Sequence, residues 1–593
     1  MDMNQPVNGR ISKLRSIMKK NGLDYYLVTG TDAHLSEYVC PHWRTREFIT
    51  GFTGSAGTVL VGRSEALLWT DSRYFIQAFQ QLGGTCVTLM KDGEEGVPSI
   101  EEYLRKNASS SSRVGTCASE ISLRDYREKK KLYESMGIEF VLCDDYLDAI
   151  WTDRPALPET KIRVMPAATA GRSREEKLAM IREKLKEKGA DYTFIAAIDD
   201  IAWITNLRAD DVPCNPVFLS YMFISQEKAV LFTSLCRFSA SVLEEVEKCI
   251  EVRPYDEVQT LLPSLSSGRA YYNDEKVNAS FISLLDSPSS FTGRDFSTDM
   301  KACKNPVELE GMRKSHVMDG AAFINAFSRV DFSKTDGTYN EIAISSLFAS
   351  EREKMEGYEG PSFNPISGFA SHGAMCHYSA DEESNASIDH DGLLVLDTGS
   401  QFSYGMTDLT RTLLFGSATD EQRRDYTLVL KGHLSLMHQK FIYGTRGYQL
   451  DVLAKQFMWN EGMSFYHGTG HGVGFNLNVH EGPERISSHP IDVVLEEGMV
   501  ISDEPGIYKE GRHGIRIENL IAVRKAEKTE FGQFMEFENL TLVPYERKLI
   551  DRSLLTREEI DEIDLYHKKV YETLYPLVRQ DARSYLRSAT LPL

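Results

Sequence analysis

The chain has 593 residues, which is too long for one hydrophobic core and predicts about three domains. Its composition, 41% hydrophobic and 26% charged, is typical of a globular protein, and the net charge of −20 disfavours a nucleic-acid surface. The nine cysteines are scattered without a CxxC pair, and no run approaches the ~18 apolar residues of a membrane-spanning helix. We therefore expect reduced thiols, a cytoplasmic location, and no nucleic-acid or membrane partner.

The first segment alternates helix-like and strand-like patterns. Its opening stretch places Leu14, Ile17 and Met18 at helical spacing before Gly22, and YYLV follows as a strand. The glycine-rich GFTGSAG and the stretch WTDSRYF come next, and prolines among polar residues then mark a linker. These patterns predict an N-terminal α/β domain over residues 1–160.

A second copy of the opening pattern begins at Arg174. The stretch REEKLAMIREKLKEKGADYTFIAAID repeats the first helix and strand; the matched pairs are Arg10 with Arg174, Lys13 with Lys177, Leu14 with Leu178, and Ile17 with Ile181. The second copy lacks the glycine-rich GFTGSAG, which indicates that the two copies have diverged in role. A repeat of this length predicts a related α/β domain over residues 161–300.

The third segment, residues 301–593, combines helix starts with short strand patterns. N-terminal capping patterns predict helices after Asn305, Thr419 and Thr556. Strand-like runs lie at LLVLD, TDLTRTLLF, MVISDE and IRIENLIAV. Helices beside antiparallel strands that are joined by short turns predict an α+β domain.

Four carboxylates at these strands indicate a metal site. Asp397 ends one strand and Asp408 begins the next after a hairpin-length connection, so the two can meet across neighbouring strands. Glu504 and Glu518 repeat the arrangement around a Pro-Gly turn. Carboxylates that converge in a buried place repel each other unless cations neutralise them. An oxygen-rich set with one histidine suits a pair of hard or borderline divalent ions such as Mn²⁺.

The histidines leave alternatives open. His467 and His471 lie in HGTGHGVG, where the glycines disfavour a helical zinc pair and the missing Lys-Ser/Thr excludes a P-loop. We expect one of these two histidines to bind metal. His377 and His480 have no sequence context that requires a ligand role, and a hydrogen-bonded structural role is the commoner one for such residues.

Several motifs taken together resemble a known family. DTGS with TDLTRT, HGTGHGVG with NVHEGP, SDEPGIY and GIRIEN are similar to the metal-binding signatures of the pita-bread metallopeptidases, and their order most resembles aminopeptidase P. WTDSRYF and NPVELEGMR extend the resemblance along the chain, as in the long three-domain form found in the cytosol. The resemblance implies two tandem creatinase-N-like α/β domains, an α+β pita-bread catalytic domain with a helical C-terminal extension, and a homodimer formed through the catalytic domain.

The resemblance also implies a chemistry. It implies removal of the first residue from peptides with proline in second position, by attack of a hydroxide that two metal ions share, and these ions are usually Mn²⁺. By motif position, Asp397 would bind one ion, His471 and Glu504 would bind the other, and Asp408 and Glu518 would bridge them. Glu504 would also be the general base.

The other motif residues have implied roles around the substrate. His377 and His480 would hydrogen-bond the substrate and the tetrahedral intermediate. His467 and Tyr508 would line the proline pocket, and Arg73 would reach the site from the N-terminal domain of its own or a partner subunit. Arg516 would orient a ligating carboxylate.

Three other functions share part of this pattern. Prolidase, which cleaves Xaa-Pro dipeptides, uses the same five ligands, but such chains usually carry one N-terminal domain instead of two. Methionine aminopeptidase normally lacks this large N-terminal part. A non-catalytic pita-bread binding module typically loses metal ligands, whereas this chain has a residue of the right type at all five positions.

Overall fold

The computed structural model describes residues 4–593, which form two compact units. The N-terminal unit ends at Ser297 and excludes residues 166–171, and the C-terminal unit comprises residues 166–171 and 298–593. Within residues 4–593, no helix is both long and apolar enough to cross a membrane.

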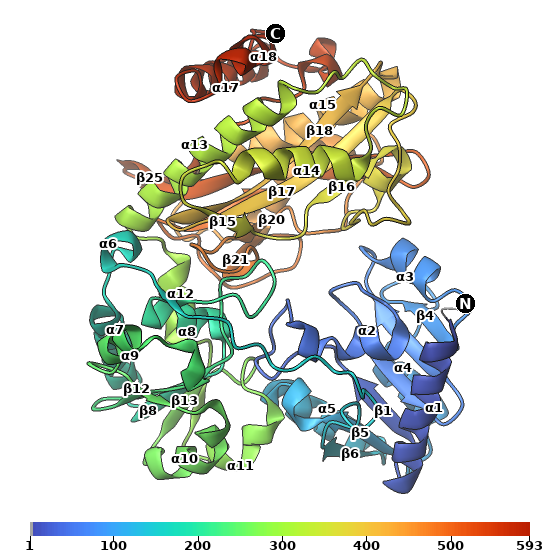
Figure 1. The fold of residues 1–593 in the computed structure, drawn as a ribbon, viewed down its shortest axis with the longest axis vertical. Coiled ribbons are helices and arrows are strands. Elements are labelled where there is room, and N and C mark those ends of the chain that lie inside the picture. Colours follow the sequence, from blue (N-terminus) through green and yellow to red (C-terminus); the bar gives the residue numbers. More distant parts are fainter. Residues whose placement is uncertain (1–3) are drawn as a thin grey trace. The chain divides into compact units, whose positions relative to one another are not determined.

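The N-terminal unit contains a first six-stranded sheet in the order β4-β3-β2-β1-β5-β6 (Figure 1). Strand β1 pairs antiparallel with β2 and parallel with β5. Strand β3 pairs antiparallel with β2 and parallel with β4. The strands are β1 (Tyr25–Val28), β2 (Thr58–Gly62), β3 (Ala66–Thr70), β4 (Val87–Lys91), β5 (Arg113–Cys117) and β6 (Glu139–Cys143), and the helices are α1 (Asn4–Lys20), α2 (Thr45–Thr50), α3 (Phe75–Gln81), α4 (Ile100–Asn107) and α5 (Leu123–Ser135).

A second six-stranded sheet in the same unit repeats this topology. Its order is β12-β11-β10-β8-β13-β14, and its central strand β8 again pairs antiparallel with one neighbour, β10, and parallel with the other, β13. The strands are β8 (Tyr192–Ile195), β10 (Tyr221–Ser225), β11 (Ala229–Phe232), β12 (Glu251–Arg253), β13 (Ala270–Tyr272) and β14 (Phe291–Thr292), and the helices are α7 (Arg174–Lys188), α8 (Ile198–Thr205), α9 (Ala240–Val246), α10 (Val258–Leu265) and α11 (Ile282–Leu285). The predicted internal repeat of two α/β modules is confirmed.

The C-terminal unit is an α+β domain, as predicted. One sheet contains β15, β17, β16 and β18, a second has the order β19-β26-β25-β22-β20-β21, and β23 and β24 form a separate hairpin. The strands are β15 (Tyr358–Pro361), β16 (Ile366–Phe369), β17 (Gly392–Phe402), β18 (Gly405–Phe415), β19 (Phe441–Ile442), β20 (Gly470–Gly472), β21 (Glu481–Ile486), β22 (Val500–Asp503), β23 (Gly506–Lys509), β24 (His513–Arg516), β25 (Asn519–Thr529) and β26 (Gly532–Asn539). The helices are α6 (Ala167–Ala170), α13 (Pro306–Phe327), α14 (Glu341–Arg352), α15 (Asp420–Met437), α16 (Asp451–Trp459), α17 (Arg557–Leu574) and α18 (Arg583–Ala589).

Three of these helices begin where the sequence predicts. The Asn305 side chain accepts hydrogen bonds from the N–H groups of Val307 and Glu308, and the Glu308 carboxylate accepts one from the Asn305 N–H. The same reciprocal capping opens α15 at Thr419 and α17 at Thr556. Each capped terminus satisfies N–H groups that the helix itself leaves without partners.

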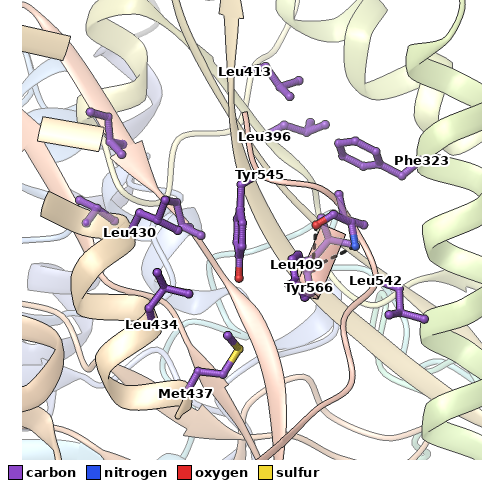
Figure 2. Close-up of a cluster of buried hydrophobic side chains, with 14 of the residues drawn as sticks. Phe323, Leu396, Leu409, Leu413, Leu430, Leu434, Met437, Leu542, Tyr545 and Tyr566 are labelled. Carbon is purple, nitrogen blue, oxygen red and sulfur yellow. Dashed lines mark hydrogen bonds between the residues drawn. The ribbon is translucent and has the colours of Figure 1, made fainter. Parts of the chain in front are cut away.

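The core of the C-terminal unit lies between the long β17–β18 hairpin and the helices. Helix α13 packs on β18, and α14 packs on β16. Figure 2 shows Leu396, Leu409 and Leu413 of the hairpin near Phe323 of α13, with side chains of α15 on the other side of Tyr545. Because side chains alternate along a strand, the neighbours of these leucines, among them Asp397 and Asp408, point to the opposite face.

Candidate metal centre

The β17–β18 hairpin fixes the first two candidate ligands. Asp397 stands opposite Thr410, and Asp408 stands opposite Gly399, so the two aspartates are offset by two residues on paired strands. An offset of two residues keeps them on one face of the sheet as diagonal neighbours. Both side chains are buried. The hairpin therefore brings two carboxylates together in a place that water reaches poorly.

His471 is held at the site by a short strand between two others. Strand β20 pairs with β21 and β22, and a register irregularity follows His471. A Cβ atom on Gly470 would lie 1.7 Å from the Ser502 carbonyl oxygen, and one on Gly472 would lie 2.3 Å from the Glu481 carbonyl oxygen. Glycine on both sides of His471 is therefore what lets β20 approach its neighbours closely.

Backbone hydrogen bonds hold Glu504 beside the start of β20 and Glu518 beside β18. The Glu504 N–H donates to the Thr469 carbonyl at 2.8 Å, and the Glu518 N–H donates to the Thr410 carbonyl at 3.1 Å. The sequence predicts one strand over IRIENLIAV, and this prediction is wrong: β24 ends at Arg516 and β25 begins at Asn519. The chain changes partner between these strands, which places Glu518 beside β18.

These side chains converge on one point. Ligand atoms of Asp408, His471 and Glu518 all lie within 4.8 Å of one another. His471 Nε2 lies 3.6 Å from Asp408 Oδ2 and 3.4 Å from Glu504 Oε1. Among the described residues, Asp397 Oδ1 and Asp408 Oδ1 are buried and have no hydrogen-bond partner. Buried carboxylate oxygens without donors are costly unless a cation contacts them.

The carboxylates of the cluster repel one another and are buried, and both effects raise their pKa values. Burial, followed by repulsion from Asp397 and Glu504, raises the pKa of Asp408 well above its usual range. Burial, followed by repulsion from Asp408 and Asp397, does the same to the pKa of Glu518. Burial raises the pKa of Glu504 to about 7, with the Asp397 charge adding to the effect and Arg516 opposing it. Divalent cations would relieve this repulsion, so the donor set fits a metal centre.

Neighbouring groups orient the candidate ligands. His471 Nδ1 lies 2.9 Å from the Gly472 carbonyl oxygen, which can only accept, so Nδ1 carries a proton and Nε2 is the ring nitrogen that faces the carboxylates. The Ser502 hydroxyl accepts from the His471 N–H and donates to Glu504 Oε1. Such hydrogen bonds fix the geometry of a metal ligand before the metal binds.

Comparisons with known proteins show which family of proteins carries such a cluster. Residues 310–525 match the model of metallopeptidase family M24, residues 533–593 match the C-terminal region of peptidase M24, and residues 10–150 and 153–308 each match a creatinase/prolidase N-terminal domain. The chain is 37% identical over 608 residues to a probable Xaa-Pro aminopeptidase P of Aspergillus niger, covering 98% of this chain and 98% of that protein. The chain belongs to the aminopeptidase P family of M24 metallopeptidases. The predicted creatinase-N and pita-bread architecture is thereby confirmed.

Solved structures of M24 proteins agree with this assignment. The crystal structure of an X-prolyl aminopeptidase from Caenorhabditis elegans, described as a cytosolic enzyme with a di-nuclear active site, matches with a TM-score of 0.94 and 31% identity. The match covers 99% of this chain and 100% of that one. An Xaa-Pro dipeptidase from Bacillus anthracis matches at a TM-score of 0.51 and 24% identity over 63% of this chain and 99% of its own, which shows a shared fold alone.

The two histidines of HGTGHGVG lie in different places in this M24 chain. His471 joins the carboxylates, whereas His467 Nε2 lies 2.9 Å from the Tyr508 hydroxyl. Arg516 Nη1 donates to the same hydroxyl at 2.7 Å, so the Tyr508 O–H is left to donate to His467. Of the two histidines whose ligand role the sequence left open, the geometry therefore favours His471.

His480 lies beside the cluster, and His377 belongs to a loop that contacts Arg516. The His480 ring is 4.3 Å from the His471 ring, centroid to centroid, and its charge lowers the pKa of Asp408 and Glu504. His377 follows Cys376, whose carbonyl oxygen accepts a hydrogen bond from Arg516 Nη2 at 3.3 Å. Both histidines therefore belong to segments in contact with the candidate centre.

Arg73 lies in the N-terminal unit, between β3 and α3. Its Nε and Nη2 atoms donate to the two carboxylate oxygens of Asp71, each at 2.8 Å. The hydrogen bonds that Arg73 donates to Asp71, together with the Asp71 charge, raise the pKa of Arg73 despite partial burial. The expected contact of Arg73 with a substrate stays a prediction.

Sequence reasoning missed two hydroxyl residues at the centre. Thr410 accepts from Arg516 Nε at 3.2 Å and donates to Glu518 Oε2 at 2.7 Å, and Ser502 links His471 to Glu504. A signal was available, because Thr410 lies two residues after Asp408 and Ser502 two residues before Glu504. A spacing of two places Thr410 on the same face of β18 as Asp408, and Ser502 lies close to Glu504, which directly follows β22.

Proposed function

We propose that the chain is a dinuclear metal-dependent Xaa-Pro aminopeptidase, which removes the first residue from peptides with proline in second position. One observation carries the proposal: the convergence of Asp408, His471 and Glu518 within 4.8 Å in a chain that matches an X-prolyl aminopeptidase over 99% of its length. Prolidase activity is the second candidate. It is less favoured because this chain has two N-terminal modules and the match to the dipeptidase covers only 63% of the chain.

Five residues would hold two divalent ions: Asp397 would bind one, His471 and Glu504 would bind the other, and Asp408 and Glu518 would contact both. The closeness of Asp408 and Glu518 supports this shared role, since their ligand atoms and a ring nitrogen of His471 all lie within 4.8 Å of one another. Mn²⁺ is the proposed metal, because four carboxylates and one imidazole form an oxygen-rich set.

When bound, the two cations lower the pKa of a water molecule and polarise the substrate carbonyl group. Residues of the chain orient the ligands and transfer the proton. Arg516 and Thr410 fix the directions of Asp397 and Glu518. Glu504, whose Oε1 accepts from the Ser502 hydroxyl, would take a proton from the attacking water and pass it to the leaving proline nitrogen.

The histidines bind the substrate. His480 and His377 donate hydrogen bonds to the scissile carbonyl group and to the oxyanion that develops on it. His467 and Tyr508, held together by their hydrogen bond, form a wall for the pyrrolidine ring. Proline needs such a dedicated wall because its peptide bond lacks an N–H and its backbone is restricted.

We further propose a homodimer that forms through the C-terminal unit and works in the cytosol. Large apolar side chains stay exposed on this unit, among them Tyr443, Trp459 and Phe531. A second copy would cover such a surface. The molar mass in solution, measured by light scattering, checks this proposal: a monomer at micromolar concentration would contradict it.

Hydrolysis of three peptides tests the activity. Metal-stripped protein is incubated with Xaa-Pro-Yaa, Xaa-Pro or Met-Ala-Yaa, with and without Mn²⁺. Mn²⁺-dependent release of the first residue from Xaa-Pro-Yaa is the expected result. Cleavage confined to Xaa-Pro would make the protein a prolidase. Inertness toward all three peptides with metal bound would favour a non-catalytic binding module.

A further inference from the structure

A fully buried carboxylate outside the metal centre organises a loop of the catalytic domain. Glu341 is the first residue of α14 and is 0% exposed. Its Oε1 accepts from the Phe369 N–H at 2.7 Å and lies 2.9 Å from His372 Nδ1. Its Oε2 accepts from the Tyr378 hydroxyl at 2.9 Å and from the Ala386 N–H at 2.7 Å. One carboxylate therefore meets four groups from a single segment of chain.

That segment is the one that carries His377. Phe369 ends β16, Ala386 lies near the end of the following loop, and Tyr378 is the residue next to His377. The Tyr378 hydroxyl oxygen also lies 2.9 Å from the Ser384 carbonyl oxygen, so these two acceptors share its one proton. Glu341 thus fastens the loop before His377, beside it and after it.

The other side of this loop packs against strands that carry residues of the metal centre. A Cβ atom on Gly514 would lie 1.6 Å from the Gly373 carbonyl oxygen, so β24 and the loop touch backbone to backbone. Arg516, at the end of β24, donates to the Cys376 carbonyl. In β16, Ile366 stands opposite Asp397. The loop is therefore held between Glu341 on one side and the strands of Asp397 and Arg516 on the other.

We propose that Glu341 is a positioning residue for His377. Its carboxylate sets the path of residues 369–386, and that path aims His377 at the substrate. This role rests on the proposed function, because His377 acts on the substrate only if the protein is the proposed peptidase. Glutamine at this position keeps the shape but replaces one acceptor oxygen by an NH₂ group, which cannot accept from two of the four donors.

A double-mutant cycle tests the proposal. Glu341→Gln is expected to lower kcat on Xaa-Pro-Yaa by about 10- to 100-fold, with bound Mn²⁺ unchanged, as when a group that orients an active-site residue is lost. In a His377→Ala background, the same substitution is expected to change kcat by less than about twofold, because its effect passes through His377. Equal losses in both backgrounds, or a loss explained by missing metal, would overturn the proposal.

Two further variants guard against misfolding and nonspecific effects. Tyr378→Phe keeps the carboxylate and removes one donor, so a smaller loss of kcat that also vanishes in the His377→Ala background is expected. Glu351→Gln is the matched control, since Glu351 lies on the same helix, is 1% exposed and pairs with Lys354 and Arg579. Its effect should be the same in both backgrounds.

Hydrogen exchange separates this proposal from the proposed function. Amides of residues 369–386 are expected to exchange faster in Glu341→Gln than in wild type or Glu351→Gln. Unchanged protection would overturn the positioning role, whatever the activity. A wild-type protein that cleaves no proline peptide but shows this exchange pattern would instead refute the peptidase assignment and leave the link between Glu341 and the loop supported.

Discussion

Arg516 Nη2 donates to Asp397 Oδ2 over 2.6 Å, and both side chains are buried. The guanidinium occupies one oxygen of the carboxylate, while the other oxygen, Oδ1, has no hydrogen-bond partner among the described residues. Because the guanidinium is planar and holds several acceptors at once, it fixes the direction of that second oxygen. Asp397 is thereby set to present Oδ1 to a cation.

We predict that Arg516→Lys weakens Mn²⁺ binding by about 10- to 100-fold, because lysine cannot contact Asp397, Thr410 and Tyr508 together. A titration of the metal-stripped protein with Mn²⁺ measures the change. Arg512→Lys is the control, since Arg512 is exposed and pairs with Glu421 at the surface. Equal affinities in the two variants would contradict the orienting role of Arg516.

We predict that Asp408→Asn abolishes peptide hydrolysis and leaves the protein folded. The substitution removes the charge proposed to bridge the two ions, and it also removes repulsion among buried carboxylates in the metal-free state. The unfolding temperature of the metal-free variant should therefore be no lower than that of the wild type. Activity, metal content and thermal unfolding check this prediction, and normal turnover would refute the two-metal assignment.

The ligand pattern was predictable because it depends on local rules. The hairpin length between Asp397 and Asp408, together with period-two alternation, is enough to place both on one face, and the glycines around His471 signal a close approach of backbones. The capping patterns at Asn305, Thr419 and Thr556 likewise fix helix starts within a few residues of chain.

Contacts between distant segments were not predictable. Glu518 leaves the expected strand because its N–H pairs with Thr410, which is 108 residues away. Glu341 meets its loop partners across 28 to 45 residues, and no spacing rule connects a residue at the start of a helix with such a loop. The choice between His467 and His471 also needed the structure, since only tertiary packing turns one toward Tyr508 and the other toward the carboxylates.

We predict that the metal-free protein loses stability as pH rises. Burial raises the folded-state pKa of Glu504 from 4.5 to about 7, so folding takes up a proton there. This contribution is fully present below about pH 4.5 and is lost as the pH rises through about 7. Saturating Mn²⁺ should reverse the trend, because ligands bind metal in the deprotonated form. The measurement is the unfolding temperature of the metal-free protein across this pH range, for the wild type and for Glu504→Gln. A wild-type unfolding temperature that falls no more steeply with pH than that of the variant would contradict the prediction.

We predict that His480→Ala lowers kcat on Xaa-Pro-Yaa by about 10²- to 10³-fold while metal content stays at the wild-type level. The ring lies beside His471 and close enough to lower the pKa of Asp408 and Glu504, but the proposed ligand set does not include it, so its loss removes one donor to the developing oxyanion. His489→Ala, at another histidine of the same domain, is the control for a general effect of losing an imidazole. Loss of bound Mn²⁺ from His480→Ala would mean that His480 is itself a ligand, and an unchanged kcat would remove it from the substrate site.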